Sequence, residues 1–121
     1  TLRVPTPEEI LRIKAWLVVS RNRTRDYLDA AALSDRIGIA AAAQTVAGLD
    51  DYYSEVNGRP ESVATQVARQ FADPRPKDPS VTKDLSSYKQ LDPRWHDWAA
   101  VVQTLRDVAV AMVDAVPEPG R

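Results

Sequence analysis

The chain has 121 residues, of which 44% are hydrophobic and 27% charged, a composition that is typical of one folded domain and not of a disordered segment. The 16 basic and 17 acidic residues give a net charge of −1, which argues against general polyanion binding by the chain as a whole. There is no cysteine, so disulfides and thiolate metal sites are excluded, and no apolar run approaches the roughly 20 residues of a membrane span. We therefore expect a single domain over residues 1–121 that lies in the cytoplasm without membrane association.

The first predicted helix carries a lysine within its apolar face. It begins after Thr6, which can cap it, has Pro7 at its first position and ends around residues 20–23. Its apolar residues recur at helical spacing and are Ile10, Leu11, Ile13, Leu17 and Val18. Lys14 projects into the middle of this arc. A lysine placed there must extend its amine to solvent, pair with a carboxylate or face an anion in a cavity.

Two further helices are predicted in the first half of the chain. The second helix is expected to be capped by Thr24, to run to Ile37 and to stop at Gly38, because glycine commonly ends helices. The third is expected to cover residues 39–56, to be rich in alanine and to end before Gly58. Its small side chains would allow close approach of a neighbouring helix.

The second half of the sequence predicts two helices separated by a proline-rich segment. One opens at Arg59-Pro60-Glu61 and reaches Ala72, and residues 73–79 contain three prolines that exclude regular helix. A short helical turn is expected around residues 82–88. The last helix is predicted to be capped by Asp92 with Pro93 at its first position, and residues 117–121 to be a frayed tail. The expected fold is all-α, with five to six antiparallel helices in an irregular bundle.

Charged residues gather around the first interhelical turn and are the strongest candidates for a functional site. They are Lys14, Arg21, Arg23, Arg25, Asp26 and Asp29. Basic residues so placed can bind phosphates, and two aspartates three residues apart share one helix face, where they can orient a base or a cation. The ordinary alternatives are a lysine packed at the rim of the core and an ion pair between Asp29 and Arg25. The only histidine, His96, has no second ligand at suitable spacing, so no metal site is expected in this chain.

Two sequence runs on either side of Lys14 resemble those of a known family. They are Val4-Pro5-Thr6-Pro7-Glu8-Glu9 and Arg23-Thr24-Arg25-Asp26-Tyr27-Leu28-Asp29-Ala30-Ala31-Ala32-Leu33. Together with the lysine, they are similar to the AbiEii/AbiGii family of nucleotidyltransferase-like toxins, which have the polymerase-β-like fold and act in toxin–antitoxin and phage-defence systems. The resemblance covers only the first quarter of the chain.

The resemblance implies roles for the charged residues. Lys14, Arg21, Arg23 and Arg25 would bind nucleotide phosphates, Arg25 and Asp26 would hold the turn, and Asp29 would be a catalytic carboxylate beside Lys14. The family's metal-binding carboxylates and their strand are absent, so the chain is expected to be the helical C-terminal part of such a toxin, inactive alone.

The complete parent is expected to use Mg²⁺ and a nucleoside triphosphate. Its partners would be the missing N-terminal catalytic domain, an antitoxin protein or tRNA. The alternative reading is a non-catalytic interaction module that docks an antitoxin or a missing domain.

Overall fold

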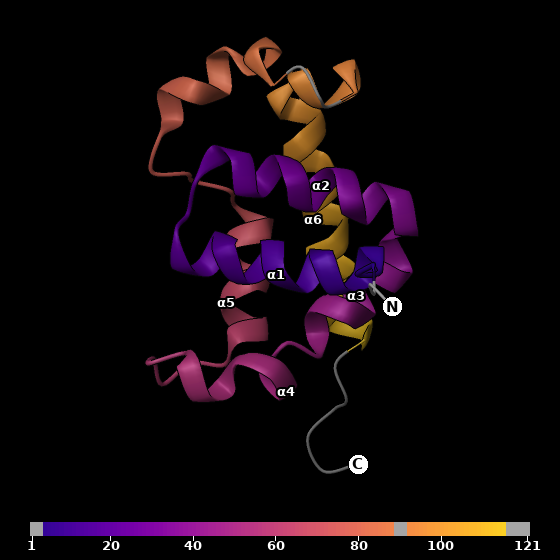
Figure 1. Ribbon diagram of the computed structural model, residues 1–121, viewed down its shortest axis with the longest axis vertical. Coiled ribbons are helices and arrows are strands. Elements are labelled where there is room, and N and C mark those ends of the chain that lie inside the picture. The colour runs from indigo at the N-terminus through magenta and orange to yellow at the C-terminus, as the bar shows by residue number, and fades with distance from the viewer. Residues whose placement is uncertain (1–3, 89–91, 116–121) are drawn as a thin grey trace.

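Every regular element in the described part of the chain is helical. The computed structural model describes residues 4–88 and 92–115. Its α-helices are α1 (Pro7–Ser20), α2 (Thr24–Ile37), α3 (Ile39–Ala47), α4 (Asp50–Tyr53), α5 (Val63–Ala72) and α6 (Trp98–Ala115). Helices α1 and α2 lie side by side and cross α5 and α6, which run along the long axis of the molecule (Figure 1). The all-α prediction is confirmed, and no feature of this arrangement supports the finer assignment to a nucleotidyltransferase.

The ends of α1 and α2 follow from local chemistry. Thr6 Oγ1 accepts a hydrogen bond from Glu9 N at 3.1 Å, with Pro7 at the first helical position, as predicted. Gly38 ends α2 as predicted, with φ 97° and ψ 144°, a conformation that strongly favours glycine. Thr24, however, is not the N-cap of α2. Arg23 occupies that position, and the Thr24 side chain is bonded to Asp78 instead.

The predicted single helix over residues 39–56 was wrong, because the chain turns after Ala47. Helix α3 ends there, α4 begins at Asp50, and residues Ser54–Val56 form a 3₁₀ turn. Gly48 is a weak helix former, and the turn places Leu49 fully inside the core. It also lets Tyr53 of α4 stack on Trp16 of α1 with ring centroids 5.0 Å apart. The helix break after Ala47 is therefore accompanied by burial of Leu49 and by the stacking of Tyr53 on Trp16. The hydrophobic periodicity of the sequence did not predict this break.

Helix α5 starts later than predicted, because Ser62 rather than Pro60 marks its beginning. Ser62 Oγ accepts from Thr65 N at 3.0 Å and caps the helix. In the segment that follows, the expected helical turn is present as two 3₁₀ turns, Pro79–Lys83 and Leu85–Ser87.

Asp92 caps only another 3₁₀ turn, Pro93–His96, instead of the last helix. Asp97 is extended, and its carboxylate accepts from Ala99 N at 3.1 Å, so α6 begins at Trp98. The predicted tail at residues 117–121 lies outside the described residues.

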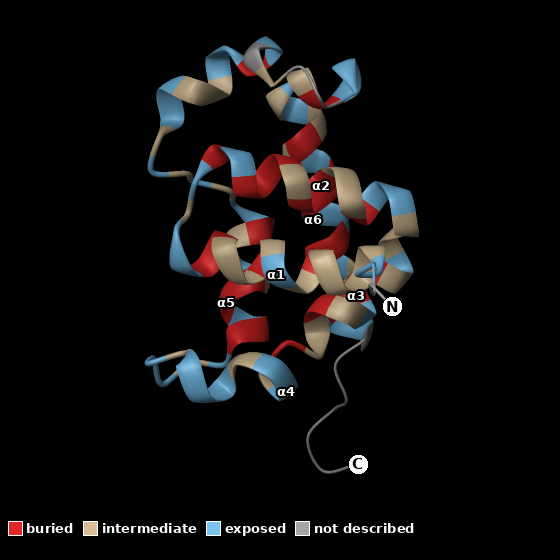
Figure 2. Cartoon of the chain, viewed as in Figure 1, coloured by how far each residue is buried: buried red, intermediate tan, exposed pale blue. Residues whose placement is uncertain are grey.

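The core lies between the two helical layers, and buried residues recur along α1, α2 and α5 (Figure 2). The largest fully buried side chains are Tyr27, Phe71, Leu11, Leu28, Leu49, Leu85 and Leu105. On α1 the buried face is Leu11, Ala15, Val18 and Val19, whereas Ile13 is 48% exposed. The predicted arc was therefore centred wrongly, because α2 and α5 cover a face rotated away from Ile13. Lys14 consequently lies at the flank of the buried face and not in its middle.

Candidate functional site

Lys14 forms an ion pair with Asp29 between α1 and α2. The distance from Nζ to Oδ2 is 2.9 Å, and the two side chains are only partly exposed. Arg25 lies one turn before Asp29 with Nε 3.9 Å from the same oxygen, and its guanidinium faces the ring of Tyr88. One carboxylate thus meets two cations, which accounts for a lysine at this position without a bound anion. A catalytic role for Lys14 and Asp29 stays a prediction.

Asp26 is fully buried and is held by Arg21. Arg21 Nη2 donates to Oδ1 at 2.6 Å and Nε to Oδ2 at 3.3 Å, a bidentate contact that compensates for the buried carboxylate. The hydrogen bond to Asp26, followed by the charge of Asp26, raises the pKa of Arg21 above its ordinary value. The resemblance assigned the holding of this turn to Arg25 and Asp26, but in the structure Arg21 contacts Asp26.

The α1–α2 turn is attached to the loop after α5 by hydrogen bonds that involve Asn22 and Thr24. Asn22 has a left-handed φ of 53°, its Nδ2 donates to Arg75 O at 2.9 Å, and its carbonyl accepts from Lys77 N at 2.8 Å. Thr24 N and Thr24 Oγ1 each donate to Asp78 Oδ1 at 2.8 Å. Burial of Asp78 acts to raise the pKa of this carboxyl, but the hydrogen bonds from Thr24, with that of its own backbone N–H and the charge of Arg23, lower the pKa overall. Sequence reasoning missed Asp78, which is 54 residues from Thr24.

A buried tyrosine closes the inner side of this junction. The Tyr27 hydroxyl donates to Asn22 Oδ1, and Gln70 Nε2 donates to Val18 O at 3.0 Å. Burial raises the pKa of Tyr27. Beside it opens a cavity of about 470 Å³ lined by Asn22, Tyr27, Arg69, Gln70, Asp73 and Arg75. Arg75 in this lining pairs with Asp73 and Arg69 pairs with Glu61, so carboxylates already meet the charges of both arginines.

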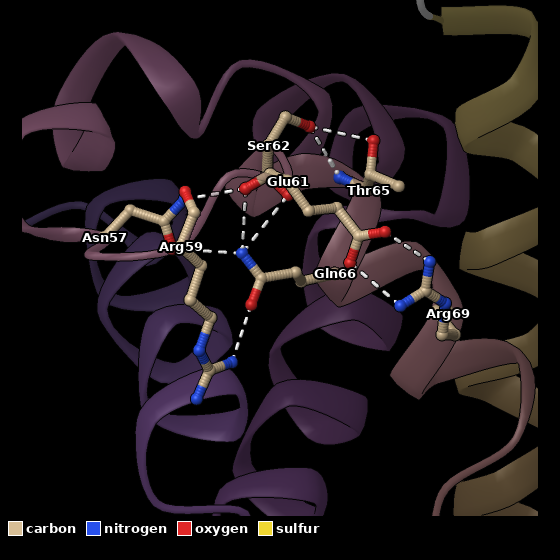
Figure 3. Close-up of polar contacts among 7 residues, drawn as sticks. All are labelled: Asn57, Arg59, Glu61, Ser62, Thr65, Gln66 and Arg69. Carbon is tan, nitrogen blue, oxygen red and sulfur yellow. Dashed lines mark hydrogen bonds and ion pairs between the residues drawn. The ribbon is translucent and has the colours of Figure 1, made fainter.

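A second polar network fixes the start of α5 and was not anticipated from the sequence. Gln66 is buried, its Nε2 donates to Asn57 Oδ1 at 2.9 Å and to Glu61 O at 3.0 Å, and its Oε1 accepts from Arg59 Nη1 at 2.6 Å (Figure 3). Arg69 forms a bidentate pair with Glu61 on the outer side. The loop before α5 is thereby tied to the helix through side-chain amides and carbonyls.

Next to this network lies an apolar hollow, which we call the α3–α5–α6 cavity. It measures about 220 Å³ and is lined by Ala47, Asp50, Ser62, Ala64, Thr65, Ala68, Ala109, Met112 and Val113. Its polar members are at the start of α5, where Asp50 Oδ1 accepts from Val63 N at 2.6 Å. On α6, Val110 is 71% and Val113 76% exposed. The cavity is therefore an apolar site with a small polar edge.

Neither a metal centre nor a spanning helix is found in the part of the chain that the structure describes. Residues 4–88 and 92–115 contain no group of three His, Cys, Asp or Glu side chains placed to hold a metal ion. His96 Nε2 lies 3.1 Å from Tyr88 O. None of the helices in these ranges is long and apolar enough to cross a membrane.

Comparison with known proteins finds relatives among much longer transport proteins. The chain is 39% identical over 114 residues to the heme uptake protein MmpL11 of Mycobacterium tuberculosis, and 36% identical over 113 residues to the mycolic acid-containing lipids exporter MmpL11 of Mycolicibacterium smegmatis. It is 37% identical to the probable transport protein MmpL11 of Mycobacterium leprae. Each alignment covers 93% of this chain, which spans only 11% of the length of each relative. No protein-family profile matches the chain. No solved structure matches it either.

These relatives overturn the resemblance to AbiEii/AbiGii toxins. That resemblance rested on a short pattern of charges, whereas the transport proteins align with nearly the whole chain. The predicted function in nucleotide transfer, toxin–antitoxin systems and phage defence was therefore wrong. The expectations of an antitoxin or tRNA partner and of no membrane association were wrong as well, and the alternative of a docking module is not supported. Mg²⁺ and nucleoside triphosphate binding by a parent protein stays a prediction, as does the cytoplasmic location.

Proposed function

We propose that this chain is a helical domain of a larger transport protein similar to MmpL11. The observation that carries the proposal is the alignment of 93% of the chain with proteins named for transport, heme uptake or lipid export. An alignment of this length must include most of the residues that form the core between α1–α2 and α5–α6. The relatives are therefore expected to contain a domain with the same two-layer helical packing, and this domain is expected to be needed for transport.

A chimeric transporter tests the proposal. The segment of the Mycolicibacterium smegmatis exporter that matches this chain is replaced by the chain, and the gene is expressed in a strain that lacks its own copy. The measurement is the amount of mycolic acid-containing lipid extracted from the cell surface. We expect the chimera to restore export and a transporter without the segment to fail. A chimera carrying Leu105→Asp, which places a charge at a fully buried position, serves as the misfolded control.

Two results would reject this function. One is a chimera that accumulates to the normal level but exports no more lipid than the transporter without the segment. The other is normal export by the transporter that lacks the segment, because a dispensable domain has no part in transport. Immunoblotting of the membrane fraction in every strain separates loss of function from loss of protein.

A second role within the same domain is favoured by the α3–α5–α6 cavity, namely binding part of an acyl chain. One relative is named for the export of mycolic acid-containing lipids. The cavity volume of about 220 Å³ exceeds the roughly 150 Å³ of an engineered apolar cavity that binds benzene. Its apolar lining suits a hydrocarbon chain, and Ser62 and Thr65 at its edge suit a hydroxyl or carbonyl oxygen.

The acyl role is tested by NMR titration of the chain with 1-octanol, a neutral chain compatible with Asp50 at the cavity edge. Amide shifts are expected at the cavity residues of α5 and α6. Ala68→Leu fills the cavity and should abolish them, whereas Ala99→Leu on the exposed face of α6 should not. Shifts that persist in Ala68→Leu, or that are spread over the molecule, would rule out this role without affecting the chimera experiment.

A further inference from the structure

Exposed cations gather where the α1–α2 turn meets the loop after α5, and we call this surface the basic end. Its members are Arg21, Arg23, Arg25, Arg75 and Lys77, and all five are exposed. They come from segments about 50 residues apart that are held together by hydrogen bonds. Lys77 N donates to Asn22 O at 2.8 Å, and Asn22 Nδ2 donates to Arg75 O at 2.9 Å. The basic end is therefore a product of the fold and not of one local sequence run.

The carboxylates at the basic end are mostly turned inward or already bonded. Asp26 is fully buried, and Asp78 Oδ1 accepts two hydrogen bonds from Thr24. Among the described residues, Arg23 and Lys77 have no ion-pair partner within salt-bridge distance. The charges presented to solvent are consequently mainly positive, although the whole chain has a net charge of −1.

Even the paired arginines of this surface keep much of their side chain in solvent. Arg21 is 52% exposed while bound to Asp26, Arg25 is 64% exposed beside Asp29, and Arg75 is 83% exposed. A planar guanidinium that is held at one edge retains further N–H donors on its other edges. These donors match phosphate oxygens, which accept several hydrogen bonds at once.

We propose that the basic end docks the domain on the phosphates of an anionic lipid bilayer. Clusters of four to eight basic residues are the usual footprint of proteins that bind anionic bilayers. The five cations lie on an outer surface, so an extended array of headgroups satisfies more of them than one small anion does. The inference rests on the proposed function, because a domain of a transport protein works beside a membrane.

Vesicle flotation with the 121-residue chain tests this docking. Vesicles of phosphatidylcholine alone are compared with vesicles containing one third phosphatidylglycerol, at low salt and at 0.5 M NaCl. We expect binding only to the phosphatidylglycerol vesicles, and loss of that binding at high salt, where the Debye length is only about 4 Å. Each basic residue near such a surface contributes about fivefold to the partition coefficient, so Arg23→Glu with Lys77→Glu should weaken binding at least about 20-fold.

A charge-matched control separates the basic end from net charge. Arg12→Glu with Arg36→Glu also lowers the net charge by four, from −1 to −5, but changes α1 and the far end of α2. This variant should retain most of the binding, and circular dichroism should show that both variants fold. Equal loss in both variants, or no binding to phosphatidylglycerol vesicles, would overturn the proposal.

A third arm measures inorganic phosphate binding by NMR titration. Amide shifts at the basic end with millimolar phosphate, without binding to vesicles, would assign the surface to a free anion and likewise overturn membrane docking. The chimera experiment measures lipid export, whereas the flotation experiment measures vesicle binding. Failure of the proposed transport function and failure of membrane docking can therefore be distinguished.

Discussion

Replacing Asp78 by alanine is expected to detach the loop after α5 from the start of α2. Thr24 is fully buried, and its N–H and hydroxyl both donate to Asp78 Oδ1 at 2.8 Å. The Thr24 hydroxyl can still donate to the backbone carbonyl of residue 78, which lies 3.2 Å away, but the Thr24 N–H loses its acceptor. A buried donor without an acceptor costs about 1–3 kcal/mol, so the free energy of unfolding is expected to fall by about that amount. Urea unfolding followed by circular dichroism measures this loss, and hydrogen exchange of the Thr24 amide should accelerate.

The same site predicts a pH dependence. The hydrogen bonds from Thr24 lower the pKa of Asp78 in the folded chain, so its stabilisation is present above the unfolded pKa of about 3.9 and is lost as the pH falls through the folded value. Asp78→Asn keeps an acceptor oxygen but removes this titration. The stability difference between the wild type and Asp78→Asn should therefore shrink between pH 6 and pH 3.

Asp73→Ala is the control variant for the Asp78→Ala prediction. Asp73→Ala removes an exposed carboxylate that pairs with Arg75, and it should change the free energy of unfolding by no more than about 1 kcal/mol. If Asp78→Ala costs no more than Asp73→Ala, and the Thr24 amide exchanges at the wild-type rate, the assigned hydrogen bonds do not hold the loop.

Four further substitutions, one of them a control, test the packing of the helices. Ser34 Oγ is buried without a hydrogen-bond partner among the described residues, so Ser34→Ala should raise the free energy of unfolding by about 1 kcal/mol in urea, and any decrease would contradict this. Gly38→Ala should destabilise the chain by about 1–3 kcal/mol because of its φ of 97°, whereas Gly48→Ala, at φ −90° and with only ordinary van der Waals contacts of 3.7 and 3.8 Å for a Cβ, should not. Lys14→Met removes the partly exposed ion pair with Asp29 and should change the stability by no more than about 1 kcal/mol in thermal unfolding, so a larger loss would show that the pair is structurally essential.

Helix ends with local chemical causes were predictable from the sequence. Thr6 and Pro7 set the start of α1, and Gly38 sets the end of α2, because each acts within four residues of its own position. The prolines after Ala72 likewise excluded a regular helix there. These features need no knowledge of what the helices pack against.

The candidate sites were less predictable, because they join residues far apart in the chain. The i, i+4 pair of Arg25 with Asp29 was foreseen as an alternative from the sequence, but the pairing of Lys14 with Asp29 became evident only when α1 lay against α2. That pairing explains the charged pattern by contacts within the fold. The resemblance to nucleotidyltransferase-like toxins had explained the same pattern by a catalytic site. Gln66 and the α3–α5–α6 cavity had no local signal at all.

The sequence by itself determined the all-α class, the N-cap of the first helix and the stop at Gly38, and the last two depend on contacts within one turn. Only the tertiary structure decided which face of α1 is buried, that the chain turns before Leu49, and that Asp78 holds Thr24. Burial depends on which neighbour covers a face, and helical periodicity contains no information about that neighbour. The basic end likewise exists only because Asn22 bonds to a loop some 50 residues away.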